Sequence, residues 1–442
     1  MDISFYIKIL SNWAIGWPLM IYVVGASIIF TIAFHAVQFR YFFSAWKTTL
    51  FPPQHSPLKA GHMTPIQAFI NTLSSSIGNG SLAGMATAVY AGGPGAAFWV
   101  IIFGFLLMAV RFAEVYTSTL YGTSTTANRS TLGGPMLYLK YVIGGNVLSY
   151  CYAIFCLLFG LFTGNAMQAN SIRLSVATTW GVPPLASAII LLLFVLYVVC
   201  GGAPRIIKAS DRIVPIKVGV FFVASFVILI FHYASLWQAI ILIVSSAFKP
   251  LALAGGVIGF TVQQAVSYGL FRSIVATESG LGTAAILFGF TGSDKPMTSG
   301  FMGMIGTFVS TLVCFLVALC IVVSGVWNTG LNSTALTIAA YNTVFGSFGG
   351  WIVSFLSISF GVGVLVTYAY IVRAAWLFLT NGRFEFMFIF LYSFFCFAGA
   401  LMTVEIVWDI INIANGGLLL INLFGLLYLL PRIRKDVIAQ MK

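Results

Sequence analysis

Long apolar runs, separated by short polar segments, follow one another along almost the whole of this chain. A helix needs about 20 consecutive apolar residues to cross the hydrocarbon core of a bilayer. By this criterion the apolar runs, and the breaks between them, predict eleven membrane-spanning helices. They cover residues 15–39, 66–90, 95–120, 146–170, 184–201, 213–233, 250–272, 300–325, 349–372, 385–404 and 406–430. The sequence therefore predicts a single all-α polytopic membrane domain.

Composition agrees with this pattern and excludes other classes of protein. Hydrophobic residues make up 60% of the 442 residues, charged residues only 7%, and the mean hydropathy is +1.03. A soluble globular domain carries roughly 25% charged residues. The net charge of +12 does not indicate a nucleic-acid partner, because the Lys and Arg residues are scattered between apolar segments. This composition therefore predicts a protein embedded in a lipid bilayer.

The distribution of basic residues predicts how the spans are oriented, because Lys and Arg are enriched in cytoplasmic loops. Suppose that the N-terminus lies outside. Of the 21 basic residues, only Lys8, Arg173 and Lys249 then face outward and Arg111 lies within a span, which leaves seventeen inside. This bias predicts a multi-pass protein of the plasma (inner) membrane, with the N-terminus outside and the C-terminus in the cytoplasm.

An internal symmetry follows the first span. The sequence predicts a leading helix at 15–39, five helices at 66–233, five more at 250–430 and a cytoplasmic tail at 431–442. Because five is odd, the two repeats have opposite orientations. The first helix of each is interrupted, by the polar run 74–81 and by the glycine-rich run 255–259. Such a pair of interrupted helices indicates the binding site of a secondary transporter. The alternative is that glycines such as Gly80 and Gly84 serve close helix packing.

The two interruptions have the chemistry to bind a small zwitterion beside a cation. Half-helix N-termini attract a carboxylate, and free carbonyls suit a cation. The candidate substrate-binding residues are those of the interruptions and one glutamine: Ser76, Gly78, Asn79, Gly80, Gly255, Gly256, Val257, Ile258 and Gln168. Gln168 and nearby Asn165 lie in an apolar span, where they could face the substrate's ammonium group or bond to another helix. The sequence leaves both interpretations open.

Charged residues near the interruptions are few. Arg272 and Glu278 are six residues apart, where they form either a local salt bridge or an ion or proton gate. Arg111 and Glu114 are three apart on one helical face, so we expect them to pair. The sequence contains no Gly-x-x-x-x-Gly-Lys-Ser/Thr loop, no His-Glu-x-x-His, and no metal-ligand spacing among its six Cys and four His. It therefore predicts a transporter, not an enzyme, with no cofactor other than sodium as a coupling ion.

Several motifs point to a known family. Residues 78–88 read Gly-Asn-Gly-Ser-Leu-Ala-Gly-Met-Ala-Thr-Ala, and residues 92–99 read Gly-Gly-Pro-Gly-Ala-Ala-Phe-Trp. Further matches follow in order at 133–136, at Gly164-Asn165 with Gln168, at 278–282 and at Val407-Trp408. Over roughly residues 15–430 the chain resembles the alanine or glycine:cation symporter (sodium:alanine symporter) family. The resemblance implies a leucine-transporter-type 5+5 inverted repeat with one extra N-terminal helix. It also implies that the first and sixth core helices and Gln168 hold the substrate.

The chain departs from the family's motifs at the ion site. Gly361 and Val362 stand where the family has a Ser-Thr pair in the eighth core helix, and Ser310 replaces an Asp in the seventh. Hydroxyls in the eighth helix help to hold sodium in this fold. Without them, the expected ion ligands are backbone groups at Ser76, Asn79, Gly361 and Val362. We therefore expect sodium to bind more weakly than in typical relatives, or not at all.

The expected function is import of a small neutral amino acid, alanine or glycine of either enantiomer, by symport with a cation, in the first place sodium. The alternative within transport is a proton-coupled or exchange-type carrier with an altered substrate. Outside transport, the alternatives are a channel or a structural membrane subunit; a channel usually shows a charged ring or a repeated filter sequence, and neither is present. The expected partners are the amino acid, the coupling cation and the bilayer, without an obligatory protein partner.

Overall fold

The computed structural model describes residues 16–52, 63–122, 133–249, 251–252, 259–291, 295–402 and 405–441. Within these ranges the regular structure is helical apart from two antiparallel two-residue strands, β1 (Leu251–Ala252) and β2 (Gly259–Phe260). Up to β1 the main helices are α2 (Trp17–Ala33), α3 (Val37–Arg40), α4 (Phe42–Leu50), α5 (Pro65–Ser76), α6 (Asn79–Gly92), α7 (Gly95–Tyr121), α8 (Pro135–Tyr138), α9 (Gly145–Leu161), α10 (Met167–Trp180), α11 (Pro184–Val199), α12 (Gly202–Phe231) and α13 (Tyr233–Phe248). After β2 they are α14 (Val262–Thr277), α15 (Thr283–Gly289), α16 (Pro296–Val323), α17 (Ser333–Phe345), α18 (Phe348–Leu379), α19 (Glu385–Leu401) and α20 (Glu405–Met441).

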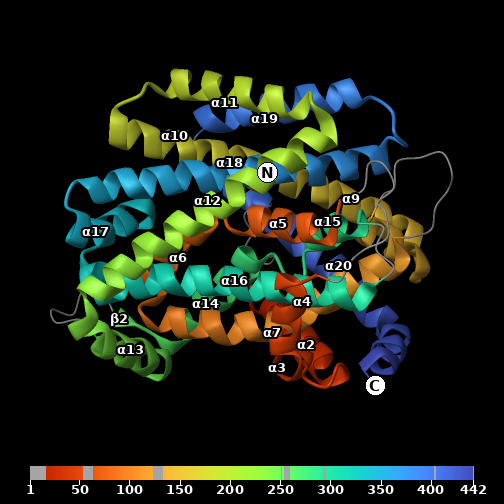
Figure 1. The fold of residues 1–442 in the computed structure, drawn as a ribbon, viewed down its shortest axis with the longest axis horizontal. Helices are drawn as coiled ribbons and strands as arrows, with labels where there is room; N and C mark the ends of the chain where they lie inside the picture. Colours follow the sequence, from red (N-terminus) through yellow and green to blue (C-terminus); the bar gives the residue numbers. More distant parts are fainter. Residues whose placement is uncertain are drawn as a thin grey trace, which may run out of the picture.

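The long helices run roughly side by side in a bundle (Figure 1). α7 packs against α16 and α14 in one part of the bundle, and α18 packs against α9, α10 and α12 in another. α11 and α19 lie beside each other at the edge. The short helix α5 contacts both α16 and α18, and it also contacts α15. The broken helices therefore lie in the interior, between the two groups of long helices.

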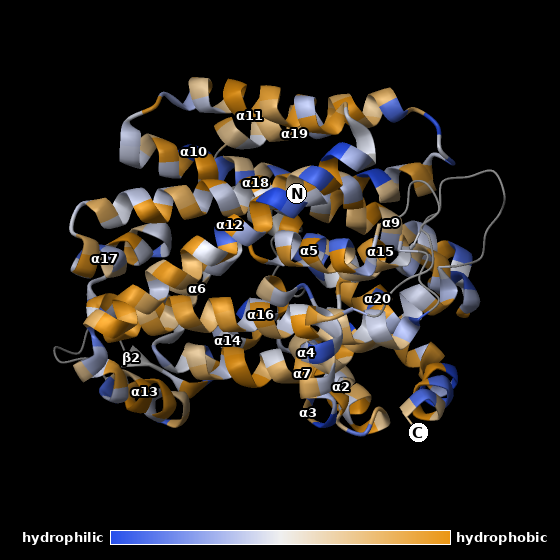
Figure 2. Cartoon of the chain, in the orientation of Figure 1, coloured by the Kyte–Doolittle hydropathy of each residue, from blue (hydrophilic) through white to orange (hydrophobic). Residues whose placement is uncertain are grey.

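Apolar residues predominate in most helices of the bundle (Figure 2). Large hydrophobic side chains are exposed on the peripheral helices, including Ile190 and Tyr197 on α11 and Phe386 and Phe390 on α19. Apolar surface of this extent would be costly in water but is stable against lipid. Six of the described helices are long and apolar enough to cross a membrane, and shorter apolar helices accompany them. The structure agrees with a multi-pass membrane protein.

The predicted span 66–90 is a helix with a break in the middle, as expected. A capping box starts α5: Thr64 Oγ1 accepts a hydrogen bond from the Gln67 N–H (3.1 Å), and Gln67 Oε1 accepts one from the Thr64 N–H (3.0 Å). The helix ends at Ser76, and α6 begins at Asn79 after two non-helical residues, Ile77 and Gly78. The polar run at 74–81 thus predicted the first break correctly.

The predicted span 250–272 is wrong in its first part. Residues 251–252 and 259–260 form the strand pair, and α14 begins only at Val262. A second capping box, between Thr261 and Gln264, starts this helix. The glycine-rich run 255–259 therefore precedes the helix and does not interrupt it. The physical reason is that glycine has low helix propensity, so a helix starts where a capping residue satisfies its first N–H groups.

The second broken helix consists of α14 and α15, and its break lies at residues 278–282. Glu278, Gly280 and Gly282 all have positive φ, of 54°, 94° and 81°. A right-handed helix cannot continue through this conformation, and glycine adopts it without steric cost. The break thus lies beyond the predicted span, in the Glu-Ser-Gly-Leu-Gly motif.

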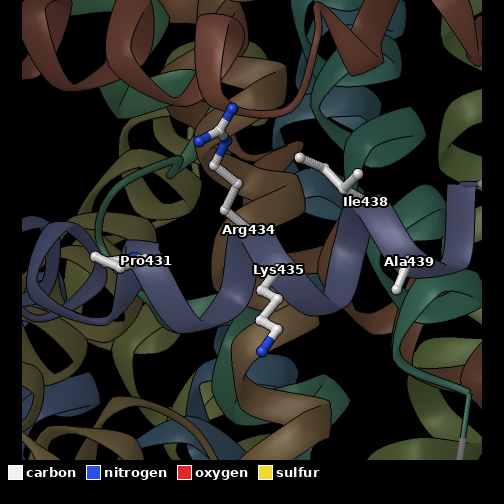
Figure 3. A pocket seen from close by; sticks show the side chains of 5 residues that line it. All are labelled: Pro431, Arg434, Lys435, Ile438 and Ala439. Atoms are coloured by element: carbon white, nitrogen blue, oxygen red, sulfur yellow. The ribbon is translucent and has the colours of Figure 1, made fainter.

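Three more helical segments differ from the prediction. α13 and α17 are additional helices in the connections after α12 and before α18. α20 continues through Pro431 to Met441, so the predicted tail is helical to that point. Its last turns carry a shallow groove, with Arg434 and Lys435 pointing in different directions (Figure 3). Arg434 Nε donates a hydrogen bond to the Ala33 carbonyl (3.3 Å), which links this end of α20 to α2.

Candidate functional site

The first break is held by hydroxyl groups of the residues that precede it. Ser76 Oγ shares a hydrogen bond of 2.7 Å with Ser310 Oγ of α16, and Ser74 Oγ donates to the Gly363 carbonyl of α18 (2.9 Å). Both serines are buried. The end of α5 is therefore fastened to both groups of long helices. Ser310, which the sequence analysis noted only because the family has an Asp there, thus helps to hold the end of α5.

Gln168, a predicted substrate ligand, lies directly against the break. Its Oε1 accepts a hydrogen bond from the Asn79 N–H (3.3 Å) at the start of α6, and its Nε2 donates to the Thr163 carbonyl (3.2 Å). Residues 162–166 form a single π-helical turn between α9 and α10, a distortion that is frequent at functional sites. Asn165 instead bonds to the Tyr392 carbonyl of α19 (2.7 Å). Of the two amides, only Gln168 contacts the break.

Gly78 and Asn79 both lie against α18. A Cβ at Gly78 would come within 2.7 Å of Val364 Cγ2, so a side chain has no room there. Asn79 Oδ1 accepts a hydrogen bond from Ser357 Oγ (2.8 Å), while its buried Nδ2 has no hydrogen-bond partner. A Cβ at Gly361 would lie 2.9 Å from this Nδ2. The structure thus brings Asn79 and Gly361, two of the predicted ion ligands, next to each other.

Gly80 and Gly84 differ sharply in their surroundings. A Cβ at Gly84 would lie 2.0 Å from Arg272 Nη1, so the guanidinium fills the space that this glycine leaves. A Cβ at Gly80 would have a single neighbour within 4 Å, again Arg272 Nη1, at 3.9 Å. Arg272 donates to the Gly80 carbonyl (3.2 Å), and its buried Nε has no partner. Gly84 therefore accommodates an arginine, and the side of Gly80 is open.

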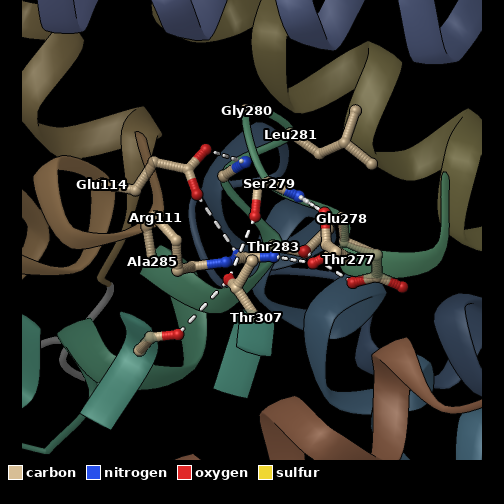
Figure 4. A network of polar contacts seen from close by, with 12 residues as sticks. Arg111, Glu114, Thr277, Glu278, Ser279, Gly280, Leu281, Thr283, Ala285 and Thr307 are labelled. Carbon is tan, nitrogen blue, oxygen red and sulfur yellow. Dashed lines mark hydrogen bonds and ion pairs between the residues drawn. The ribbon is translucent and has the colours of Figure 1, made fainter. Parts of the chain in front are cut away.

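The second break is held by a buried ion pair. Arg111 and Glu114 on α7 form the predicted salt bridge, with 3.2 Å between Nη1 and Oε2. Arg111 Nη2 donates to the Thr277 carbonyl at the end of α14, and Glu114 Oε1 accepts from the Gly282 N–H (3.0 Å) at the start of α15. Figure 4 shows both side chains reaching the loop between the two half-helices. Each charge faces the helix end of opposite partial charge.

Two further side chains complete this network. Asn422 on α20 donates to both Glu114 Oε1 (2.7 Å) and the Gly280 carbonyl (2.8 Å). The Tyr152 hydroxyl donates to the Leu281 carbonyl (2.7 Å). The backbone groups freed by the second break are thus largely satisfied by the protein itself. Sequence reasoning missed Asn422, which is distant in sequence and carries no local signal.

Arg272 and Glu278 do not form the salt bridge that one interpretation predicted. The ion pairs among the described residues are Arg111–Glu114 and Arg373–Glu385. The buried carboxylate of Glu278 accepts hydrogen bonds from three hydroxyls: Ser75 (3.2 Å), Thr283 (2.7 Å) and Tyr368 (2.6 Å). These residues belong to α5, α15 and α18. Glu278 therefore joins both broken helices to α18.

A buried lysine, which lies within the predicted span 213–233 and which the sequence analysis did not single out, reaches the first break. Lys217 on α12 donates from Nζ to the carbonyls of Ile77 (2.8 Å) and Ser74 (3.1 Å). Its Nζ also lies 5.4 Å from the centre of the Phe360 ring. A Cβ at Gly363 would lie 2.7 Å from Nζ. The only signal in the sequence is a lysine near the start of an apolar run.

Two sets of predicted ligands have no described contact at the first break. Residues 255–258, which include the predicted ligands Gly255, Gly256, Val257 and Ile258, lie outside the described part of the chain. Val362 is partly buried against the core, within the continuous helix α18. In the described ranges, no cluster of His, Cys, Asp and Glu could hold a metal ion. The polar groups at the first break therefore suit a carboxylate at the start of α6 and a cation at the end of α5.

Comparison with known proteins agrees with this geometry. A family model described as the sodium:alanine symporter family matches residues 2–440. A transporter of Haemophilus influenzae is 31% identical over all of this chain and 96% of its own length. The sodium/alanine symporter AgcS of Methanococcus maripaludis is 29% identical over 97% of this chain and 95% of its own.

Solved structures show the same fold at low sequence identity. A manganese transporter of Eremococcus coleocola aligns with 87% of this chain and 80% of its own, with a TM-score of 0.58 and 11% identity. The arrangement is the predicted leucine-transporter-type fold, with its two broken helices facing each other in the interior. The chain therefore belongs to the sodium:alanine symporter family and is a multi-pass membrane transporter, not an enzyme, that couples amino-acid movement to a cation.

Proposed function

We propose that this chain imports a small neutral amino acid, alanine or glycine of either enantiomer, by symport with a cation. The observation that supports the substrate class is the open side of Gly80 at the start of α6, next to Arg272. The N-terminus of a helix and a guanidinium both attract a carboxylate. In the described part of the chain, Arg272 has no carboxylate partner. The substrate's own carboxylate would supply one.

The rest of the substrate is expected to point toward α10. Gln168 Oε1 lies against Asn79, and the buried hydroxyl of nearby Thr163 has no hydrogen-bond partner. Both can accept a hydrogen bond from an ammonium group. Val364 packs closely on the neighbouring Gly78, so little room is left beside the break for a long side chain. The names of the family and of AgcS also favour alanine.

We assign the gating role to Arg272 and Glu278. Arg272 connects α14 to α6, and Glu278 connects both broken helices to α18. Any movement that opens one side of the break must therefore rearrange their hydrogen bonds. In this proposal the two repeats, 66–233 and 250–430, move relative to each other. The excess of basic residues in alternate loops supports an inner-membrane protein with its N-terminus outside and its C-terminus in the cytoplasm.

The coupling cation is sodium or a proton. The family and AgcS are named for sodium. If sodium is the ion, its proposed ligands are the backbone groups at Ser76, Asn79, Gly361 and Val362. A proton is the alternative, because the hydroxyl pair expected at 361–362 is absent.

Uptake by purified protein in liposomes tests this function. Radiolabelled alanine should enter saturably, unlabelled alanine or glycine should compete, and a sodium or pH gradient imposed alone should identify the ion. In a carrier, unlabelled substrate inside the liposomes accelerates the entry of labelled substrate from outside, even without an ion gradient. In a channel it does not. Lack of saturable alanine and glycine uptake and exchange, in folded protein, would contradict the proposed substrate class.

A further inference from the structure

We propose that the ammonium group of Lys217 is a tethered cation that takes the place of a bound sodium ion at the end of α5. This proposal rests on the transport function above, but it concerns which cation serves the first break. It makes Lys217 a residue that determines ion specificity. Sequence reasoning expected a free cation at the carbonyls around residues 76–79; the structure places a lysine side chain there instead.

The first argument is the position of the ammonium. Lys217 Nζ donates to the carbonyls of Ile77 and Ser74, in the last turn of a half-helix that ends in the interior. The C-terminal end of a helix carries negative partial charge, and its last carbonyls lack helical partners. In transporters with broken helices, these are the groups that coordinate a coupling ion. An ammonium bound to them satisfies the same oxygens.

The second argument is the space made for the ammonium. A Cβ at Gly363 would lie 2.7 Å from Lys217 Nζ, which is too close, and 3.0 Å from Ser74 Oγ, which is a tight contact. Glycine at this position therefore permits the lysine to reach the break. The Phe360 ring, one turn earlier on α18, lies 5.4 Å from Nζ and adds a cation–π contact. α18 thus leaves space for the ammonium and contacts it. The family's hydroxyl ligands would lie close to this position on the same helix.

The third argument is the charge balance around Lys217. The helices α5, α11, α13, α16 and α17, which pack against α12, contain no Asp, Glu, Lys or Arg. On α18 the one charged residue is Arg373, which pairs with Glu385. Asp211, on the same helix as Lys217, accepts a hydrogen bond from Gln67 (3.1 Å). A second cation at the same carbonyls would have no added negative charge to balance it, so ammonium and sodium exclude each other.

The acid groups of the two breaks do not alter this balance. Glu278 contacts α5 at Ser75, whose hydroxyl donates a hydrogen bond to the carboxylate, and not at Ser74 or Ile77. Glu114 is paired with Arg111. Neither carboxylate forms an ion pair with the ammonium, which is held by backbone oxygens. Sodium would need to compete with a cation that is covalently attached and always present at high local concentration.

Thermal unfolding in detergent tests the proposal without any substrate. The unaltered protein should have the same Tm in sodium chloride and in choline chloride of equal ionic strength. Lys217→Ala frees the carbonyls, and it should gain a sodium-specific rise in Tm, because an ion that binds only the folded state stabilises it. Lys208→Ala, which removes an exposed lysine of the same helix, is the matched control and should show no sodium effect.

Exchange of radiolabelled alanine in liposomes is the second measurement. Exchange by the unaltered carrier should be equal in sodium and choline, whereas Lys217→Ala should exchange slowly in choline and recover with sodium. If Lys217→Ala does not yield folded protein, Lys217→Gln, which keeps most of the side-chain volume, replaces it in both measurements. Sodium-specific stabilisation of the unaltered protein that persists in the variant would overturn the proposal, and so would a variant with no sodium effect in either measurement. Absence of alanine exchange in every form would count against the proposed substrate, while the unfolding measurement still decides the role of Lys217.

Discussion

Gly80 and Gly84 provide a test of the site, because they lie one helical turn apart and the same substitution should affect different properties. It should weaken substrate affinity at Gly80 and lower stability at Gly84. At Gly80 an added methyl group would lie 3.9 Å from Arg272 Nη1, which is an ordinary contact. At Gly84 it would lie 2.0 Å from the same atom. Gly80→Ala should therefore leave folding intact and intrude on the substrate, whereas Gly84→Ala should displace Arg272.

The expected magnitudes follow from these contacts. A methyl group inserted into a fitted space costs about 1–3 kcal/mol, which corresponds to a roughly 5- to 160-fold weaker alanine affinity for Gly80→Ala. Displacing Arg272 in Gly84→Ala breaks its hydrogen bond to the Gly80 carbonyl. A hydrogen bond to a charged group contributes about 1.5–3 kcal/mol, and alanine returns about 1 kcal/mol of helix propensity. The net loss of stability should be about 0.5–2 kcal/mol.

The assay measures alanine affinity and Tm on the same purified samples. Substrate-dependent thermal shift gives the affinity per folded molecule, and the Tm without substrate gives stability. Gly80→Ala should weaken the affinity without lowering the Tm, and Gly84→Ala should lower the Tm. If folded Gly80→Ala bound alanine as tightly as the unaltered protein, the open side of Gly80 would not be part of the substrate-binding site. If Gly84→Ala had an unchanged Tm, Arg272 would not depend on that glycine.

Three further predictions concern topology, gating and ion specificity. A reporter that works only in the cytosol should be active when fused after Lys442, and labelling of the C-terminus from outside the cell would contradict the predicted orientation. Glu278→Gln keeps the size of the side chain but weakens its hydrogen bonds to hydroxyls such as that of Tyr368; as a gate variant it should slow exchange with little change in affinity, and a pure loss of affinity would argue against gating. Gly363→Ser combined with Lys217→Ala places a hydroxyl beside the freed carbonyls, so it should bind sodium more tightly than Lys217→Ala alone, as measured by the sodium dependence of Tm; equal dependence would show that position 363 does not face the ion.

Part of the site could be predicted because its signals are local. The first break is visible in the sequence, since a polar run with two glycines cannot form an ordinary membrane helix. The Arg111–Glu114 pair follows from a spacing of three residues on one helix. Gln168 was identified by its position in a motif, and the structure places it against Asn79.

The second break shows where local reasoning failed. Glycine content alone favoured the run 255–259, but that run precedes α14. The real break, at 278–282, carries fewer glycines in a row and is stabilised by Glu114 and Asn422 from other helices. A helix can end in the membrane interior only where such partners satisfy its backbone groups, and their identity is decided by packing.

The sequence by itself determined the class of this protein, because hydrophobicity, charge bias and motif order are properties of the chain that need no partner. It determined that the chain spans a membrane many times and that the first core helix is broken. Only the tertiary structure decided which charges meet which helix ends. Lys217 and Ile77 are 140 residues apart, and Arg272 and Gly80 are 192 apart. No local pattern encodes such contacts, because they depend on how separate helices pack around buried polar groups, most of which find a partner.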